Sequence, residues 1–218
     1  MAVKYIDKVC AICGYKQELL VSTKDDTNNI LHNLNNYINF NLEVCPKCGY
    51  ISNDLQINYS SFNNVKNNQS FKNATNYLYL PDNDFYEKLM SYPANLYEGF
   101  ALICENHLDY ENAIRAYFRT VVLKNAICSV LEQEKLEDLE DLDQNEINQY
   151  NTIISGLNNS AKQNLQKIIS IYDYSKKSLY TKLILVKVYL MLDDLTNAEL
   201  LFDSMKELVS DIDIKQLY

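Results

Sequence analysis

Cys10-Ala-Ile-Cys13-Gly14-Tyr15 and Cys45-Pro-Lys-Cys48-Gly49-Tyr50 are two nearly identical segments, here called the first and second knuckles. In each knuckle two cysteines lie three positions apart and a glycine follows the second one. Two thiolates at this spacing can bind one metal ion from a tight turn, and glycine permits the left-handed backbone that closes the turn. A site completed by both knuckles has no position left for water or substrate, so its predicted role is structural. The predicted ligands are Cys10, Cys13, Cys45 and Cys48.

Zinc (Zn²⁺) is the predicted metal, because a closed site of four cysteine thiolates is typical of structural zinc. Iron is the alternative, since the knuckles are also similar to those of rubredoxin, and both metals accept a tetrahedral set of thiolates. The segment between Cys13 and Cys45 contains no Pro and no Trp, so the aromatic, proline-containing core of rubredoxin has no counterpart. The sequence therefore favours zinc over iron.

Other interpretations of the cysteines have less support. Two separate redox pairs would each need a strand-to-helix context that is absent around the knuckles. Four unrelated buried cysteines would not produce a duplicated pattern. His32 is expected to be a surface side chain because four thiolates already complete a site. Cys104 and Cys128 lie on apolar helical stripes and are expected to be small buried hydrophobic residues.

The 31 residues between Cys13 and Cys45 exceed the spacing of about 15–20 that is usual in such modules. Residues 18–21 are predicted to form a strand that leaves the first knuckle, and residues 41–44 a strand that enters the second. Ile30, Leu31, Leu34 and Ile38 recur at helical spacing between them, which predicts a short inserted helix. Residues 1–57 are therefore predicted to be a four-cysteine, zinc-ribbon-like module.

Residues 58–83 are predicted to be an Asn-rich connector, because residues 58–76 show isolated apolar side chains without a sustained period. Residues 84–218 are predicted to form an all-helical domain, since their apolar residues step by three and four. Pro93 is expected in the first turn of a helix, and Gly156 is a candidate interruption of a long one. The capping box Thr196–Glu199 is expected to open the last helix, with Leu208 facing inward.

A weak internal repeat relates residues 107–117 to residues 192–202. Both segments fit the turn and second-helix start of a tetratricopeptide unit, with a small Ala (Ala113, Ala198) followed four residues later by an aromatic side chain. The copies are 85 residues apart, which is no multiple of the tetratricopeptide period of about 34. The sequence thus indicates either irregular tetratricopeptide-like, antiparallel helix hairpins or an ordinary helical bundle. The predicted fold class is mainly α.

The net charge of −9 and the pI of about 4.7 make nucleic acid or an anionic membrane an unlikely partner, since an acidic surface repels phosphate. The N-terminal residues lack the apolar core of a signal peptide, and no later stretch approaches a membrane span. A cytoplasmic location is expected, where cysteines stay reduced. The acidic run 132–146 is expected to be a solvated helix end or loop, with a docking surface for a basic partner as the alternative.

The sequence contains no Gly-rich phosphate loop, no HExxH and no Gly-x-Ser-x-Gly motif. Neither of its two histidines, His32 and His107, has an evident acid or nucleophile partner. We therefore expect no enzymatic activity. The predicted function is that of a zinc-binding interaction or scaffold protein with a protein or peptide partner; the alternatives are a rubredoxin-like iron electron carrier and a nucleic-acid adaptor.

The two knuckles, with their flanking Lys8-Val9 and Val44, and the helical half that follows resemble the bacterial family called domain of unknown function 2225. The resemblance spans nearly the full length, although the first knuckle carries Ala11 where the family usually has proline. That family has no established activity. The resemblance therefore implies the architecture, a cysteine module followed by tetratricopeptide-like helices, and implies nothing about mechanism.

Overall fold

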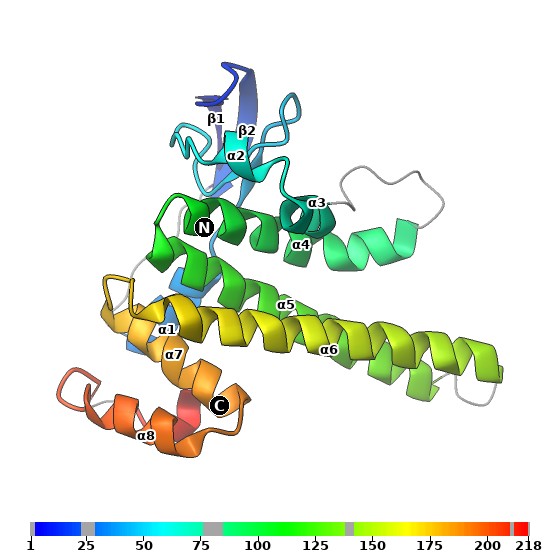
Figure 1. The fold of residues 1–218 in the computed structure, drawn as a ribbon, viewed down its shortest axis with the longest axis vertical. Coiled ribbons are helices and arrows are strands. Elements are labelled where there is room, and N and C mark those ends of the chain that lie inside the picture. Colours follow the sequence, from blue (N-terminus) through cyan, green and yellow to red (C-terminus); the bar gives the residue numbers. More distant parts are fainter. Residues whose placement is uncertain (1–2, 23–28, 76–84, 138–141, 210–211, 218) are drawn as a thin grey trace.

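The computed structural model describes residues 3–22, 29–75, 85–137, 142–209 and 212–217, which are mainly helical (Figure 1). The strands are β1 (Val3–Val9), β2 (Lys16–Ser22), β3 (Glu43–Val44) and β4 (Ile51–Ser52). The helices are α1 (Ile30–Ile38), α2 (Phe62–Val65), α3 (Gln69–Thr75), α4 (Phe85–Asn106), α5 (Tyr110–Glu137), α6 (Gln144–Tyr172), α7 (Leu179–Met191), α8 (Leu195–Asp203) and the 3₁₀ helix η3 (Ile214–Leu217). The predicted mainly α class, with short strands and clustered cysteines near the N-terminus, is confirmed.

The N-terminal region consists of two antiparallel hairpins, β1–β2 and β3–β4, with α1 between them. The strand predicted for residues 18–21 and the inserted helix are confirmed as β2 and α1, and the strand predicted for residues 41–44 is confirmed only at residues 43–44, as β3. β1 was not anticipated, because only its partner carries an evident apolar run. The side chain of Asn29 caps α1 by accepting a hydrogen bond from the backbone N–H of His32. Leu34 and Ile38, one turn apart, are buried. Amphipathic spacing thus determines which face of α1 packs inward.

The prediction of an irregular connector is wrong for residues 62–65 and 69–75, which form α2 and α3. The isolated apolar residues of this segment are buried, because α2 and α3 pack against α4 instead of crossing the surface. A helix as short as α2 shows no sustained period in the sequence, so periodicity could not reveal it. The buried side chains are Tyr59, Phe62, Val65 and Phe71. Residues 76–83 of the predicted connector lie outside the described residues.

The helical half is built from consecutive helices that pack side by side, α4 on α5, α5 on α6, and α7 on α8. In Figure 1 the far ends of α5 and α6 extend together beyond the other helices as an arm. The start of α6 carries a complete capping box, in which Asp143 accepts from the N–H of Glu146 and Glu146 accepts from the N–H of Asp143. The described residues of the acidic run 132–146 form the end of α5 and the start of α6, where the sequence predicted a solvated helix end or loop.

Four details of the helical prediction are wrong. Pro93 lies inside α4, which already begins at Phe85; Pro93 is exposed, so the carbonyl that loses its N–H donor can be solvated. Gly156 does not interrupt α6. The cap of α8 is Asp194, not Thr196, because the Asp194 carboxylate accepts from the backbone N–H of Asn197. Leu208, expected inside, is exposed beyond the end of α8.

The internal repeat corresponds to a shared turn structure. Leu108 and Asp193, at equivalent positions, both adopt the left-handed backbone, with φ of 63° and 58°. The next residue of each copy donates its backbone N–H to a carbonyl five residues earlier, at 2.9 Å in both turns. This 6→1 hydrogen bond across a left-handed residue is the Schellman arrangement that ends a helix.

The residue that follows each left-handed position then caps the next helix. Asp109 accepts from the backbone N–H and the side-chain amide of Asn112, and Asp194 does the same with Asn197. One residue further on, a fully buried alanine allows the paired helices to approach each other. The α4–α5 and α7–α8 pairs therefore reverse direction by the same turn. The buried alanines are Ala113 and Ala198, and the buried aromatic residues four positions later are Tyr117 and Phe202.

One connected apolar core runs from the cysteine region into the helices. It includes Cys10 and Tyr50 near the knuckles, Phe100 on α4 and Leu217 in η3. Cys104 and Cys128 are buried within the helical half, as predicted. The division into residues 1–57, 58–83 and 84–218 stays a prediction. In the part of the chain that the structure describes, every helix is too short or too polar to span a bilayer.

Candidate metal centre

Each knuckle forms the turn of one two-stranded hairpin. The first lies between Val9 and Lys16, which pair across β1–β2, and the second lies between Val44 and Ile51, which pair across β3–β4. The first cysteine of each knuckle donates its N–H to the carbonyl of the tyrosine five residues later and accepts from the N–H of the glycine, at 2.8 to 2.9 Å. The duplicated sequence therefore produces a duplicated structure.

Gly14 and Gly49 adopt φ of 71° and 72°, the left-handed backbone that their position after the second cysteine predicts. A Cβ atom added at Gly14 would meet no atom within 4 Å, and the same is true at Gly156 in α6, where φ is not positive. The two glycines therefore differ in backbone conformation and not in available space. They form a matched pair for testing how much the knuckle depends on its turn.

We expect Gly14→Ala to lower the free energy of unfolding by about 1–2 kcal/mol, the cost of placing a side chain in the left-handed region. Gly156→Ala should raise it by about 0.5–1 kcal/mol, because alanine is the better helix former and the site is open. Urea unfolding of both variants, prepared with the metal content of the wild type, measures the two changes. Equal changes in both variants would contradict the role given to the turn.

The structure brings all four predicted ligands together. Their Sγ atoms all lie within 4.8 Å of one another. Across the two knuckles, Cys10 Sγ lies 3.8 Å from Cys48 Sγ, and Cys13 Sγ lies 3.6 Å from Cys45 Sγ. Bonds of about 2.3 Å to a tetrahedral zinc ion would separate ligand sulfurs by about 3.8 Å. The observed separations leave room for one metal ion at the centre of the four sulfurs.

The surroundings of the four cysteines would favour their charged thiolate form once a cation is bound. Burial raises the pKa of the Cys10 and Cys48 thiols, although backbone N–H groups of the knuckles oppose this change. The backbone N–H of Tyr15 lowers the pKa of Cys13 to about 7. A divalent cation compensates the negative charge of buried thiolates. The backbone N–H groups that point at the sulfur atoms stabilise the same thiolate form. The donor set therefore fits a thiophilic metal.

Lys8 joins the two hairpins beside the cysteines. Its Nζ lies 2.6 Å from Glu43 Oε1, at the start of β3, and 3.0 Å from Asp54 Oδ1, after β4. The other oxygen of Glu43 accepts from the backbone N–H of Leu55 at 2.8 Å, and the Leu55 carbonyl accepts from Ala11 in the first knuckle at 2.8 Å. Lys8 and Glu43 are largely buried. These contacts hold one knuckle against the other, so the four sulfurs do not depend on metal alone for their proximity.

Aromatic side chains connect the second knuckle to the helices. Tyr50, the last residue of that knuckle, is fully buried; its hydroxyl donates to the Ile57 carbonyl and accepts from the N–H of Tyr59. Its ring lies 5.1 Å from the ring of Phe62 on α2. The Tyr59 hydroxyl in turn donates to Asp109, the cap of α5. A continuous path of packed residues therefore links the candidate metal centre to the α4–α5 turn.

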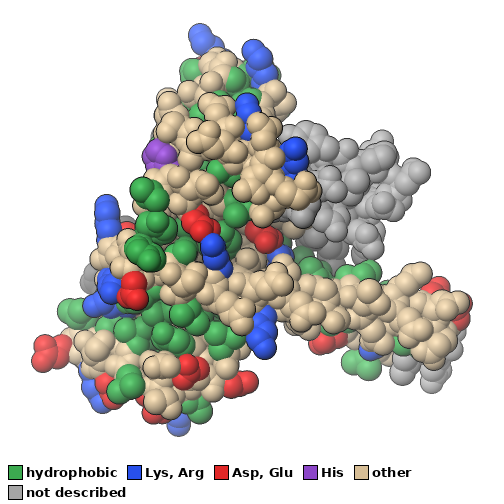
Figure 2. Space-filling view, viewed as in Figure 1, with side chains coloured by type: hydrophobic (Ala, Val, Ile, Leu, Met, Phe, Trp, Pro, Cys, Tyr) green, Lys and Arg blue, Asp and Glu red, His purple; other side chains and the backbone are tan. Residues whose placement is uncertain are grey.

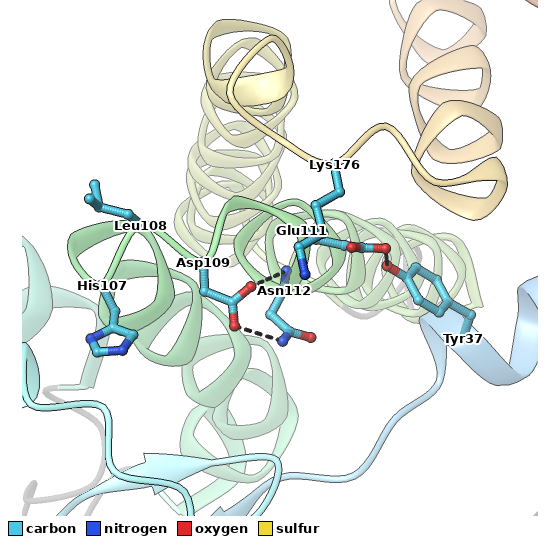
Figure 3. Close-up of a pocket in the computed structure, with 7 residues that line it drawn as sticks. All are labelled: Tyr37, His107, Leu108, Asp109, Glu111, Asn112 and Lys176. Carbon is cyan, nitrogen blue, oxygen red and sulfur yellow. Dashed lines mark hydrogen bonds between the residues drawn. The ribbon is translucent and has the colours of Figure 1, made fainter.

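A polar hollow of about 420 Å³ lies at that same turn. Figure 3 shows the side chains that line it. Its carboxylates already have structural partners: Asp109 accepts from Asn112 and Tyr59, and Glu111 Oε1 accepts from the Tyr37 hydroxyl at 3.0 Å. Both carboxylates therefore position helix ends and the docked α1. The residues that line the hollow are Tyr37, His107, Leu108, Asp109, Glu111, Asn112 and Lys176.

Sequence reasoning found the four cysteines but missed the residues that bring the knuckles together. Lys8, Glu43 and Asp54 meet only in the folded chain, and no local spacing relates them. One signal was available: Lys8 lies two residues before Cys10, and Glu43 lies two residues before Cys45. His32 is exposed and contacts the side chain of Asn36, in agreement with its expected surface position.

Comparisons of this chain with models of known protein families, with curated proteins and with solved structures find no match. The resemblance to the family called domain of unknown function 2225 stays a prediction that rests on the cysteine knuckles. What the structure establishes is the class of site, four convergent cysteines on two hairpins at the end of a helical protein.

Proposed function

We propose that Cys10, Cys13, Cys45 and Cys48 bind one structural zinc ion in a cytoplasmic, non-enzymatic interaction protein. The observation that carries the proposal is the convergence of four thiols whose closest sulfurs across the knuckles are 3.6 and 3.8 Å apart. Four protein ligands fill a tetrahedral zinc, so the ion would stabilise the two hairpins and activate no water. The short strands supply little apolar surface, which is the situation in which small modules use a metal.

Elemental analysis with an absorption spectrum, on protein purified without added metal, tests this proposal. We expect about one zinc per chain and no visible absorption, because zinc(II) has a filled d shell. One iron per chain with visible charge-transfer bands would instead favour the rubredoxin-like electron carrier. Protein that is folded, contains neither metal and takes up none when zinc is added would contradict the proposal.

The helical half is proposed to bind a protein or peptide partner. Its support is apolar surface that the core does not use: Leu195, Leu200 and Leu208 are between 51% and 65% exposed, and apolar side chains gather over α7 and α8 in Figure 2. Exposed apolar side chains that lie close together are typical of interaction sites, whereas isolated ones need no explanation. The nearby acidic residues disfavour nucleic acid as the partner.

The partner surface is tested by a charge substitution within it. Leu200→Glu with Leu208→Glu should abolish recovery of the protein that co-purifies with the wild type, because a carboxylate disfavours an apolar contact. Leu136→Glu is the matched control, since Leu136 is 68% exposed but lies near the far end of α5. If all variants recovered the partner protein equally, this surface would not be the partner-binding site.

A further inference from the structure

A second cavity, of about 380 Å³, lies where α1, α5, α7 and η3 meet. Its apolar wall comes from several elements, with Ile38 from α1, Phe118 and Val122 from α5, and Leu190 from α7. The polar part of the lining consists of two cationic side chains, Arg119 and Lys187, and of three asparagines, Asn35, Asn39 and Asn125. A cavity with mostly apolar walls and a few convergent polar groups is the usual form of a small-molecule site.

Neither cation has an anionic partner among the described residues. The ion pairs of these residues include neither Arg119 nor Lys187. The Nε–H of Arg119 is buried without a hydrogen-bond partner, and its guanidinium is 5.8 Å from the centre of the Tyr97 ring. Lys187 donates to the carbonyl of Leu217. Burial lowers the pKa of Lys187, which shows that the cavity disfavours an uncompensated ammonium.

Two other cationic side chains in the interior, Lys124 and Arg115, do have partners within the protein. Lys124 is almost fully buried and lies 2.6 Å from both Glu98 and the Ser160 hydroxyl. Arg115 stacks on two aromatic rings and donates to a backbone carbonyl. The chain has 29 acidic residues against 20 basic ones, so anionic partners are plentiful. Two cations that line one cavity and have no anionic partner among the described residues therefore indicate a place for an anion.

We propose that this cavity binds a small organic acid with one carboxylate and an apolar body. The carboxylate would accept hydrogen bonds from Arg119 and Lys187, since the planar guanidinium matches carboxylate geometry. The body would lie against Ile38, Phe118 and Val122, where it removes apolar surface from water. The volume is near the lower end of the range of about 300–1,000 Å³ for ligand sites, which suits a small molecule and excludes a folded partner.

Titration calorimetry of the metal-loaded full chain with octanoate tests the proposal, with octan-1-ol and acetate as matched probes. Octanol keeps the apolar body and lacks the charge, whereas acetate keeps the charge and lacks the body. We expect saturable binding of one octanoate per chain and at least about tenfold weaker binding of each matched probe. Equal affinity for octanol and octanoate, or no saturable octanoate binding, would overturn the proposal.

Substitutions locate the binding site. Arg119→Gln and Lys187→Met should each weaken octanoate binding by about tenfold or more, and Lys206→Met, at an exposed lysine paired with Asp203, should leave it unchanged. Lys187→Met is the variant most certain to fold, because it removes a charge that burial disfavours. Thermal unfolding without ligand checks this for each variant. Octanoate affinity unchanged in folded Lys187→Met protein would assign the binding elsewhere and overturn the proposal.

Discussion

Cys45→Ser is expected to abolish stoichiometric metal binding and to unfold the two hairpins, while the helical half keeps its helices. Cys45 is fully buried and its Sγ lies 3.6 Å from that of Cys13, so a serine oxygen would leave an incomplete, buried site. Structural zinc sites contribute about 10–16 kcal/mol of binding free energy in small modules, which exceeds what these short strands could replace. Elemental analysis and hydrogen exchange, compared with the wild type, measure the two losses.

Cys128→Ser provides the matched control. Cys128 is buried in the helical half, on α5, where a serine hydroxyl can donate to the backbone carbonyl one turn earlier in its own helix. This variant should keep the full metal content and lose little stability. If Cys45→Ser kept one metal per chain, or if Cys128→Ser lost the metal as well, the assignment of the four ligands would be wrong.

Phe100→Ala is expected to destabilise the cysteine region and the helices together. Phe100 is fully buried on α4, and its ring lies 5.9 Å from the rings of both Phe40, which precedes β3, and Tyr59, which precedes α2. Truncation of a buried phenylalanine typically costs about 3–5 kcal/mol, because transfer energy is lost and a cavity is left. Urea unfolding followed by far-ultraviolet circular dichroism and by metal release should show both transitions at lower denaturant.

The control for this variant is Leu136→Ala, near the end of α5, whose side chain is 68% exposed and whose truncation should change stability by well under 1 kcal/mol. The decisive comparison is between the two signals. Coincident shifts of helix loss and metal release in Phe100→Ala would show that the contacts of Phe100 stabilise both regions. A shift confined to the helix signal would show that the cysteine region is stable by itself.

The part of the site that the sequence predicts is the part that depends on short spacing. Cys10 and Cys13 are brought together by their own turn, and so are Cys45 and Cys48, so the knuckles can be recognised without knowledge of the fold. The amphipathic α1 and the long helices of the C-terminal half follow from periodicity in the same way. The repeated turn was found because an alanine and an aromatic residue four positions later recur in both segments.

What the sequence does not predict depends on tertiary contacts. The Asn-rich segment after residue 58 becomes helical because Phe62 and Val65 are buried against α4, although four residues cannot show a helical period. Pro93 favours the start of a helix as a local signal, but α4 extends beyond it because one lost hydrogen bond on an exposed side is tolerated. Asp194 outcompetes Thr196 as a cap since the preceding left-handed turn determines where α8 begins.

The position of α1 between the knuckles has a thermodynamic consequence. α1 packs against α5 and α7, and Arg115 on α5 stacks on Tyr37 and donates to its carbonyl. The chain from Cys13 to Cys45 is thus held at both ends by the cysteine cluster and in its middle by the helices. An ion bound by both knuckles closes this loop and so raises the effective concentration of α1 at its docking surface on α5 and α7. By reciprocity, a substitution on α5 that releases α1 weakens ion binding by the factor by which ion binding strengthens the docking of α1.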